Sequence, residues 1–162
     1  MRNDNVATRF FNEPNTTFDK SYMTVSYQDN KYYSYSTVIA QITQTIDNKT
    51  ACIISYQTFS NTTAKHIGQL KYACPHKIYH LPQKYNAKEF QPLIIFHDLK
   101  DWLEHYGNSK LTQKPNRQGF IDCYEMLKGT LDLIMFEPMF EQIKDVLDSY
   151  NDLYVQLINW RK

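Results

Sequence analysis

The residue types best suited to metal chemistry lie close together near the middle of the chain. Cys74, His76 and His80 fall within seven consecutive positions, and His66 precedes them. Thiolate and imidazole groups are common zinc ligands, but zinc needs four ligands that converge. No further Cys or His pair at such spacing occurs, and histidines exposed on a lysine-rich segment explain the same residues. We therefore predict that the chain has no metal site. If it had one, Cys74, His76 and His80 would be the weak candidate ligands.

Covalent and nucleotide-dependent catalysis find no support in the sequence. None of the patterns GxSxG, GxGxxG, HExxH or the Walker loop occurs, and these patterns supply nucleophiles, phosphate cradles and metal ligands. Cys52 lies between apolar neighbours in a predicted strand, where cysteine usually packs as a small apolar group. Cys123 lies on a predicted helix with no histidine close in sequence. We therefore predict that the chain is not an enzyme and requires no cofactor.

The C-terminal segment carries the strongest spatial pattern. A helix from Glu137 to about Trp160 gathers apolar side chains on one side and acids within an arc of about 80° on the other. The acids are Glu137, Glu141, Asp145, Asp148 and Asp152. Acids spaced four apart destabilise a helix by about 0.2–0.5 kcal/mol per pair. The stripe is therefore either a solvated helix face or an electrostatic docking edge for a basic partner, and both interpretations stay open.

The chain is nearly neutral overall, but its charge is unevenly distributed. With 18 Lys and Arg against 17 Asp and Glu, the net charge of +1 excludes a uniformly basic nucleic-acid coat protein and a uniformly acidic DNA mimic. Residues 1–90 hold ten basic and six acidic side chains, a net charge of +4. Residues 91–162 hold eight basic and eleven acidic side chains, a net charge of −3.

Lysines and tyrosines alternate in the basic segment 65–88. They are Lys65, Lys71, Tyr72, Lys77, Tyr79, Lys84, Tyr85 and Lys88. Cations and stacking rings are what single-stranded nucleic acid needs. A solvated lysine-rich surface beside buried tyrosines explains the same pattern, and we favour it over direct nucleic-acid binding.

Aromatic residues are unusually frequent, at 15% of the chain, and 13 of them are tyrosines. Tyrosine combines a large apolar ring with a hydroxyl and is enriched at protein interfaces. Tyr32 and Tyr33 must point to opposite faces of a strand. We therefore expect at least one of them outside the core, as a candidate anchor of a partner-binding surface.

The order of the predicted elements indicates an α+β fold. Segments 22–28, 32–43 and 50–58 are rich in β-forming residues and are separated by Asp-Asn-Lys turns, which is typical of an antiparallel meander. Residues 60–63 offer N-caps for a helix over 62–73, and 77–81 is a possible short strand. We predict an antiparallel sheet of three or four strands with this helix packed on it, followed by a helical C-terminal half.

Three helices are expected in that C-terminal half. Asp98 caps the first and Gly107 ends it, residues 120–128 form the second, and the long final helix follows. Residues 108–119 are expected to be a polar loop.

Two regions make up the expected domain organisation. Residues 1–20 are expected to form a loose arm that docks through Phe10 and Phe11. Residues 21–162 are expected to form a single α+β domain. Its strand meander and helix occupy residues 21–75, and its helical part occupies residues 93–162.

Targeting signals are also absent from the sequence. No stretch of 18 apolar residues occurs, so we expect no membrane partner. The first residues lack the apolar core of a signal peptide. Three widely spaced cysteines indicate a reducing compartment rather than a disulfide framework.

Two short stretches carry a resemblance to a known group of proteins. A recurring pattern, Y-x-T-x-I-A followed by S-x-T-T-x-K-H, is similar to two segments of this chain. They are residues 35–40 (YSTVIA) and residues 58–67 (TFSNTTAKHI). The pattern belongs to small proteins from phages and mobile elements of Gram-positive bacteria, and the similarity covers residues 22–75. The whole chain resembles type II-A anti-CRISPR proteins, which inhibit Cas9.

That resemblance implies a stoichiometric inhibitor that binds the Cas9–guide RNA complex and blocks cleavage of target DNA, in the cytoplasm of the bacterial host. The net charge of +1 disfavours whole-molecule DNA mimicry, so we expect restraint of the HNH nuclease domain. The expected partner-binding residues are Glu137, Glu141, Asp145, Asp148, Asp152, Tyr32 and Tyr33. The alternative function is a phage regulatory protein that binds DNA or RNA through residues 65–88.

Overall fold

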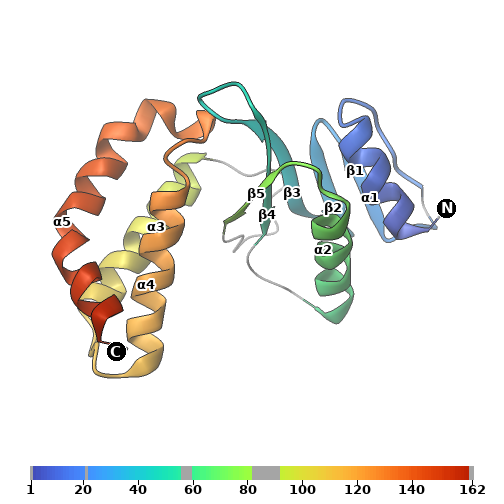
Figure 1. Ribbon diagram of the computed structural model, residues 1–162. Helices are drawn as coiled ribbons and strands as arrows, with labels where there is room; N and C mark the ends of the chain where they lie inside the picture. The colour runs from blue at the N-terminus through green and yellow to red at the C-terminus, as the bar shows by residue number, and fades with distance from the viewer. Residues whose placement is uncertain (1, 21, 56–59, 82–91, 161–162) are drawn as a thin grey trace. The chain divides into compact units, whose positions relative to one another are not determined.

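The chain folds into two compact units, Met1–Phe90 and Gln91–Lys162. The sequence predicted a single domain over residues 21–162. The computed structural model describes residues 2–20, 22–55, 60–81 and 92–160, and its fold is α+β (Figure 1). Each unit buries its own set of apolar side chains. The boundary between the units falls where the net charge of the sequence changes from +4 to −3.

A five-stranded sheet forms the centre of the first unit, and its spatial order β1-β2-β3-β4-β5 is the chain order. The strands are β1 (Val25–Gln28), β2 (Lys31–Ser34), β3 (Thr37–Gln44), β4 (Thr50–Ser55) and β5 (Lys77–Leu81). All neighbours are antiparallel except β4 and β5, which are parallel. The sheet is therefore mixed, where three or four antiparallel strands were expected. Parallel neighbours require a crossover connection, and the helix after β4 provides it.

Residues with left-handed backbone make the hairpin turns of the sheet. Asp29 (φ 53°) and Asn30 (φ 66°) join β1 to β2, and Asn48 (φ 63°) lies between β3 and β4, as their residue types predict. Tyr35 (φ 56°) also adopts this conformation. The single strand expected over 32–43 is therefore two strands with a turn between them, because a tyrosine in the left-handed region gives no turn signal in the sequence.

Helix α1 (Asn3–Asn12) occupies the segment that was expected to be a loose arm. Phe10 is fully buried and Phe11 is 7% exposed. Their spacing from Val6 and Ala7 places all four side chains on one face of a helix, which explains why this polar segment folds. The segment is thus a packed helix rather than a loose arm, whereas the expected docking through Phe10 and Phe11 is confirmed.

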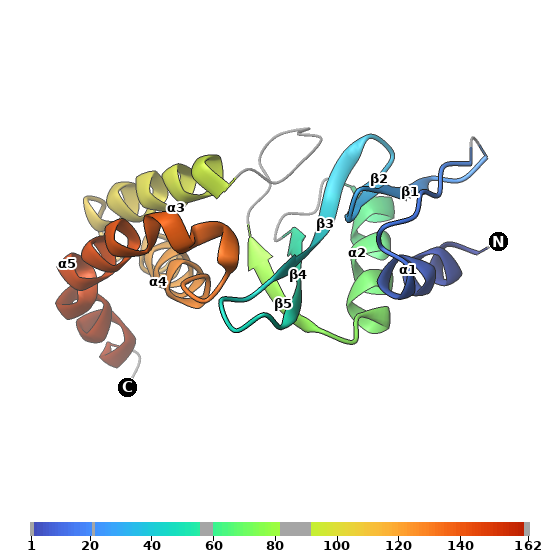
Figure 2. The same ribbon diagram turned by 90° about the horizontal axis from the view of Figure 1, so that it is seen from above.

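Helix α2 (Asn61–Ala73) lies beside α1, and both pack against the sheet in one apolar core (Figures 1 and 2). The hydroxyl oxygen of Ser60 accepts a hydrogen bond from the backbone N–H of Thr63 at 3.1 Å, so the predicted N-cap is confirmed. The core joins residues from both helices and from four strands. Its largest members include Phe10, Tyr27, Tyr32, Ile39, Ile54 and Leu70.

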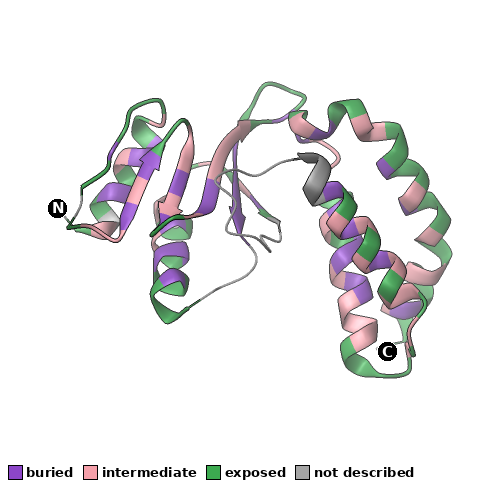
Figure 3. Ribbon diagram, turned by 180° about the vertical axis from the view of Figure 1, so that it is seen from behind, coloured by how far each residue is buried: buried purple, intermediate pink, exposed green. Residues whose placement is uncertain are grey.

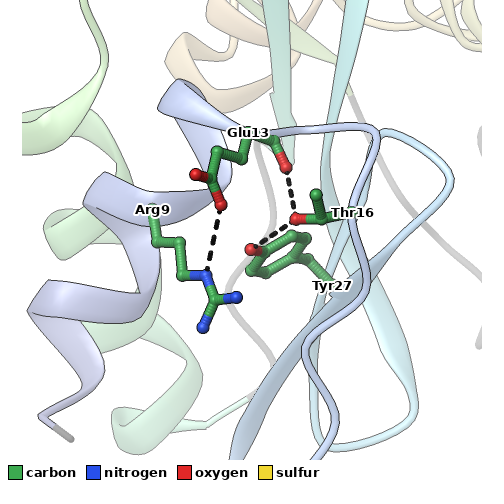
Figure 4. Close-up of polar contacts among 4 residues, drawn as sticks. All are labelled: Arg9, Glu13, Thr16 and Tyr27. Carbon is green, nitrogen blue, oxygen red and sulfur yellow. Dashed lines mark hydrogen bonds and ion pairs between the residues drawn. The ribbon is translucent and has the colours of Figure 1, made fainter.

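A short chain of polar contacts holds the end of α1 near β1 (Figure 4). Arg9 Nε lies 3.5 Å from a carboxylate oxygen of Glu13, one turn further along. The hydroxyl of Thr16 donates to the backbone carbonyl of Glu13 at 2.7 Å and lies 3.0 Å from the hydroxyl of Tyr27. Because the Thr16 proton is used on that carbonyl, the Tyr27 hydroxyl is the donor to Thr16.

The second unit is helical, as predicted for this half of the chain. Its elements are α3 (Pro92–Gly107), α4 (Lys114–Gly129), the 3₁₀-helix η1 (Ile134–Met139) and α5 (Phe140–Asn159). The first helix begins at Pro92 rather than at Asp98, because proline suits a first helical turn. Pro115 has the same role in α4, which therefore takes up half of the expected loop. The final helix begins at Phe140 rather than at Glu137, because residues 134–139 form the tighter 3₁₀ helix.

Helix α4 contacts both α3 and α5. The Tyr106 ring of α3 lies directly over Gly119 of α4, where an added Cβ would be 2.5 Å from the ring carbon Cζ. The Tyr124 ring of α4 stacks on Tyr154 of α5, with centroids 4.0 Å apart. Aromatic rings therefore form much of the contact between neighbouring helices in this unit.

Candidate functional site

Four carboxylates form an exposed stripe on α5, which we call the acidic face: Glu141, Asp145, Asp148 and Asp152. At about 100° per residue they fall within an arc of about 60°. Exposed residues follow this side of the helix in Figure 3. The sequence predicted that Glu137 belongs to the same stripe. Glu137 is exposed too, but it lies in η1 and is therefore not part of the repeat of α5.

The opposite side of α5 packs against its own unit. Ile143, Leu147 and Leu157 are buried. The other apolar residues predicted for this side are half-buried: Phe140, Val146, Tyr150, Leu153, Tyr154 and Ile158. The predicted apolar side of the helix is therefore confirmed, and its burial fixes which residues of α5 reach the solvent.

Polar contacts from α4 hold α5 in this rotation. The Tyr124 hydroxyl lies 3.4 Å from Asn151 Oδ1 and 3.5 Å from the Leu147 carbonyl oxygen, and either can accept its one proton. The Tyr154 hydroxyl donates to a carboxylate oxygen of Glu125 at 2.9 Å. Burial, together with the negative charge of Asp148, raises the pKa of Tyr124. The Tyr124 hydroxyl therefore stays protonated and available as a donor to α5.

The charge of the acidic face is largely uncompensated. Lys144 is the single basic residue of α5, against four acids. Within the residues that the structure describes, no ion pair involves these four carboxylates. Neighbouring like charges at i and i+4 disfavour the helix, so a basic partner would relieve a repulsion as well as add attraction.

The two tyrosines expected on the binding surface have different environments. Tyr32 is fully buried in the core of the first unit, so it is not an exposed anchor, contrary to expectation. Tyr33, on the opposite face of β2, is half-buried. Among the residues that the structure describes, the strongly exposed tyrosines are Tyr22 (72%), Tyr35 (59%) and Tyr72 (96%). Sequence alone gave no signal for Tyr35, because its exposure follows from the unpredicted turn.

The basic segment 65–88 is only partly a surface of cations and rings. Lys65, Lys71 and Lys77 are exposed, whereas Tyr79 is 5% exposed beneath the Lys77 ammonium, which lies 4.8 Å from the ring centroid. Tyr72 projects beside a groove of about 480 Å³ between α1 and α2. The other members of the pattern, Lys84, Tyr85 and Lys88, lie outside the described residues.

The candidate metal ligands do not assemble into a site. Cys74 donates to the His76 carbonyl at 3.5 Å, and the His76 ring meets the ring of Phe11 edge-on at 6.2 Å. His80 is exposed on β5. Across the ranges that the structure describes, no three His, Cys, Asp or Glu residues form a group able to hold a metal ion.

Instead, Cys74 interacts with Cys52, and sequence reasoning missed this pairing of distant residues. The Cys52 thiol on β4 donates to the Ile53 carbonyl at 3.8 Å. Its interaction with Cys74 and its burial raise the pKa of Cys52. Cys52 is fully buried, and Cys74 is half-buried. The two are brought together by the crossover from β4 through α2 to β5.

A buried histidine network was also missed. His66 of α2 is 1% exposed, and its Nδ1 lies 2.7 Å from the hydroxyl oxygen of Ser34. Its Nε2 lies 3.2 Å from Thr24 Oγ1 and 3.3 Å from Asn3 Nδ2. Thr63 completes the network at 3.1 Å from Ser34. With both nitrogens partnered inside the fold, His66 ties α1 and α2 to the sheet rather than facing a substrate.

Comparison of the chain with protein-family models, with curated proteins and with solved structures finds no match. No helix in the described part of the chain is long and apolar enough to cross a membrane. Function is therefore inferred from the surfaces described above, of which the acidic face is the most strongly patterned.

Proposed function

We propose that this protein is a non-enzymatic inhibitor that docks the acidic face of α5 on a basic surface of a partner protein. The observation that carries the proposal is the exposure of four carboxylates along one side of a helix whose other side is buried. A rigid, single-signed edge of this kind speeds association with a basic partner and selects against acidic ones.

The partner proposed is the Cas9–guide RNA complex, on the resemblance of residues 35–40 and 58–67 to phage proteins of this class. A nuclease that holds a heteroduplex in a positively charged channel has basic surfaces to offer. The positive net charge of residues 1–90 disfavours mimicry of DNA by the whole molecule. We therefore favour restraint of the HNH domain, which blocks cleavage without displacing target DNA.

The test is a pull-down of the tagged full-length chain with the Cas9–guide RNA complex, followed by cleavage and target-DNA binding measured side by side. The expected result is capture, with cleavage lost and DNA binding retained. Equal loss of both activities would exclude the HNH version of the proposal. Failure of capture would exclude Cas9 as the partner.

Matched charge reversals test the acidic face itself. Asp145→Lys combined with Asp148→Lys reverses two charges on the acidic face. Asp19→Lys combined with Asp101→Lys makes the same change in net charge at two exposed positions outside α5. Inhibition is expected to fall for the first variant and persist for the second. Equal inhibition by both variants would remove the acidic face from the docking surface.

A second function, binding of single-stranded nucleic acid, is favoured by Tyr72. Its ring is 96% exposed and lies beside Lys71, with Lys65 in the same groove. Base stacking on an exposed ring and contacts from lysines suit this ligand. A gel-shift with single-stranded DNA and RNA, without Cas9, would then show binding that weakens steeply with salt and is reduced by Tyr72→Ala. Absence of any shift at low salt would exclude this function.

A further inference from the structure

The groove between α1 and α2 has the size and the lining of a site for a polar ligand. The two helices lie side by side (Figures 1 and 2), and the groove between them has a volume of about 480 Å³. This volume falls within the range of about 300–1,000 Å³ that is typical of ligand pockets. Its polar lining residues are Asn5, Thr8, Lys65 and Gln69. Among the described residues, no Asp or Glu lines the groove, so its charge favours an anionic ligand.

The α2 side of the groove places a cation, an open floor and an aromatic ring in one row. Lys65, Gly68 and Tyr72 are three and four residues apart, so they share one face of the helix and span about 10.5 Å along its axis. A Cβ added to Gly68 would meet nothing within 4 Å, so the space over the middle of the row is open. The Tyr72 ring at the end of the row is 96% exposed. A flat ring can therefore enter the groove beside Tyr72.

Gln69 supplies a hydrogen-bonding group that the fold leaves unused. Its side-chain amide oxygen is buried and has no hydrogen-bond partner among the residues that the structure describes. A buried acceptor without a donor is unfavourable. Because Gln69 lines the groove, a turn of its amide toward the groove breaks no hydrogen bond of that oxygen and presents it to a donor on a ligand.

These features fit a nucleotide better than they fit a partner helix. An amphipathic helix docks its apolar face into an apolar groove, whereas amides, a hydroxyl and an ammonium group line this one. A nucleotide offers a base that stacks on an exposed ring, N–H donors on the edge of that base, and a phosphate for a lysine.

We infer that the groove between α1 and α2 binds one nucleotide of a single strand. The base stacks on the Tyr72 ring, a base N–H donates to the Gln69 amide oxygen, and a phosphate lies beside Lys65. This inference rests on the second proposed function, binding of single-stranded nucleic acid, and gives that function a site. Lys71 is exposed outside the groove, and residues 1–90 carry a net charge of +4, so the flanking phosphates of a strand also meet positive charge.

Gly68→Leu tests the groove without weakening the helix. The leucine side chain occupies the open space, and leucine is a better helix former than glycine, so the melting temperature should not fall. Binding of a fluorescein-labelled single-stranded DNA of about 12 nucleotides to the full-length chain is measured by fluorescence anisotropy at low salt. Gly68→Leu and Tyr72→Ala should each weaken binding by about tenfold. The matched control is Tyr22→Ala, which removes a ring that is 72% exposed outside the groove and should change Kd by less than about twofold.

Gln69→Leu adds a readout that a folding defect would not produce. The substitution removes an oxygen that has no partner to lose, so the melting temperature should stay level or rise. Binding of the strand should nevertheless weaken by about fivefold, because the base loses an acceptor. A Gln69→Leu variant that binds as tightly as the parent would remove Gln69 from the site.

The outcomes separate the site from the function. Equal binding of the strand by the parent, Gly68→Leu and Tyr72→Ala would overturn the groove as the site and leave single-strand binding standing. No binding of the strand by the parent at low salt would overturn both. Adenosine monophosphate should bind more weakly than the strand, because it lacks the flanking phosphates. If it bound the groove as tightly as the strand, the ligand would be a free nucleotide, and the assignment to a strand would be wrong.

Discussion

Tyr27 and Tyr32 face each other across the β1–β2 hairpin. The Tyr27 hydroxyl has a hydrogen-bond partner, whereas the Tyr32 hydroxyl finds none among the residues that the structure describes. Both side chains are fully buried, and both rings lie near Phe10, at centroid distances of 5.5 and 5.3 Å. Tyr27 reaches Thr16 in the loop that follows α1 (Figure 4). Tyr32 has a desolvated hydroxyl, and burial raises its pKa.

This pair predicts opposite effects of the same substitution. Tyr32→Phe removes a buried hydroxyl without a partner and should raise the free energy of unfolding by about 1 kcal/mol. Tyr27→Phe removes a satisfied hydroxyl and leaves Thr16 with one partner fewer, so it should lower that free energy by about 1 kcal/mol. Urea unfolding of both variants measures the difference. A loss of stability in Tyr32→Phe would mean that its hydroxyl is satisfied in solution.

The buried histidine predicts a pH-dependent stability. Burial, with a smaller contribution from Lys65, lowers the pKa of His66 below its ordinary value of 6.5. The unfolded chain therefore takes up this proton at higher pH than the folded chain. The free energy of unfolding should fall as the pH drops below about 6.5 and level off below the folded-state pKa.

Two variants assign that pH dependence. Although His80 is exposed on β5, partial desolvation of its ring and the charge of Lys71 lower its pKa, so it acts in the same direction and needs its own control. The stability difference between about pH 7.5 and about pH 5.5 should shrink more in His66→Gln than in His80→Gln. If His66→Gln kept the full pH dependence of the parent, another group would be responsible.

Two helical glycines predict changes of opposite sign. Gly119→Ala places a methyl group against the Tyr106 ring and should lower the free energy of unfolding by about 1–3 kcal/mol. Gly68→Ala, where nothing lies within 4 Å, should raise it by about 0.5–1 kcal/mol, because alanine is the better helix former. In a Tyr106→Ala background, Gly119→Ala should no longer destabilise. Persistence of the loss there would show that the ring is not its cause.

For the proposed docking on the Cas9–guide RNA complex, the acidic face predicts a kinetic signature. Asp145→Lys with Asp148→Lys should lower the association rate constant at low salt by about tenfold and flatten its dependence on ionic strength. The dissociation rate should change less, because exposed charges steer the encounter more than they hold the complex. Surface plasmon resonance over a salt series measures both. If the substitutions changed only the dissociation rate constant, these side chains would lie in a desolvated interface instead.

Local signals in the sequence predicted the features that depend on neighbouring residues. The Ser60 cap, the Asp29-Asn30 turn and the strand at 77–81 follow from residue type and position. The apolar side of α5 follows from helical periodicity, because burial selects the same residues wherever the helix packs.

Features that depend on distant residues were missed. Helix α1 forms because Phe10 finds Tyr27 and Tyr32, whereas its own sequence is polar. The burial of Tyr32 depends on which face of the sheet the two helices cover, and strand alternation alone leaves that choice open. The interaction of Cys52 with Cys74 requires the crossover through α2, which the predicted antiparallel meander did not contain.

The chain order of the sheet has a consequence for how the protein is made. Among β1 to β4, each strand pairs with the next strand along the chain, so the pairing of these four strands needs no residue beyond Ser55. Such local hairpins can close while the ribosome is still adding later residues. The parallel strand β5 has to wait until α2 has emerged, and the two cysteines come together only at that late step of synthesis.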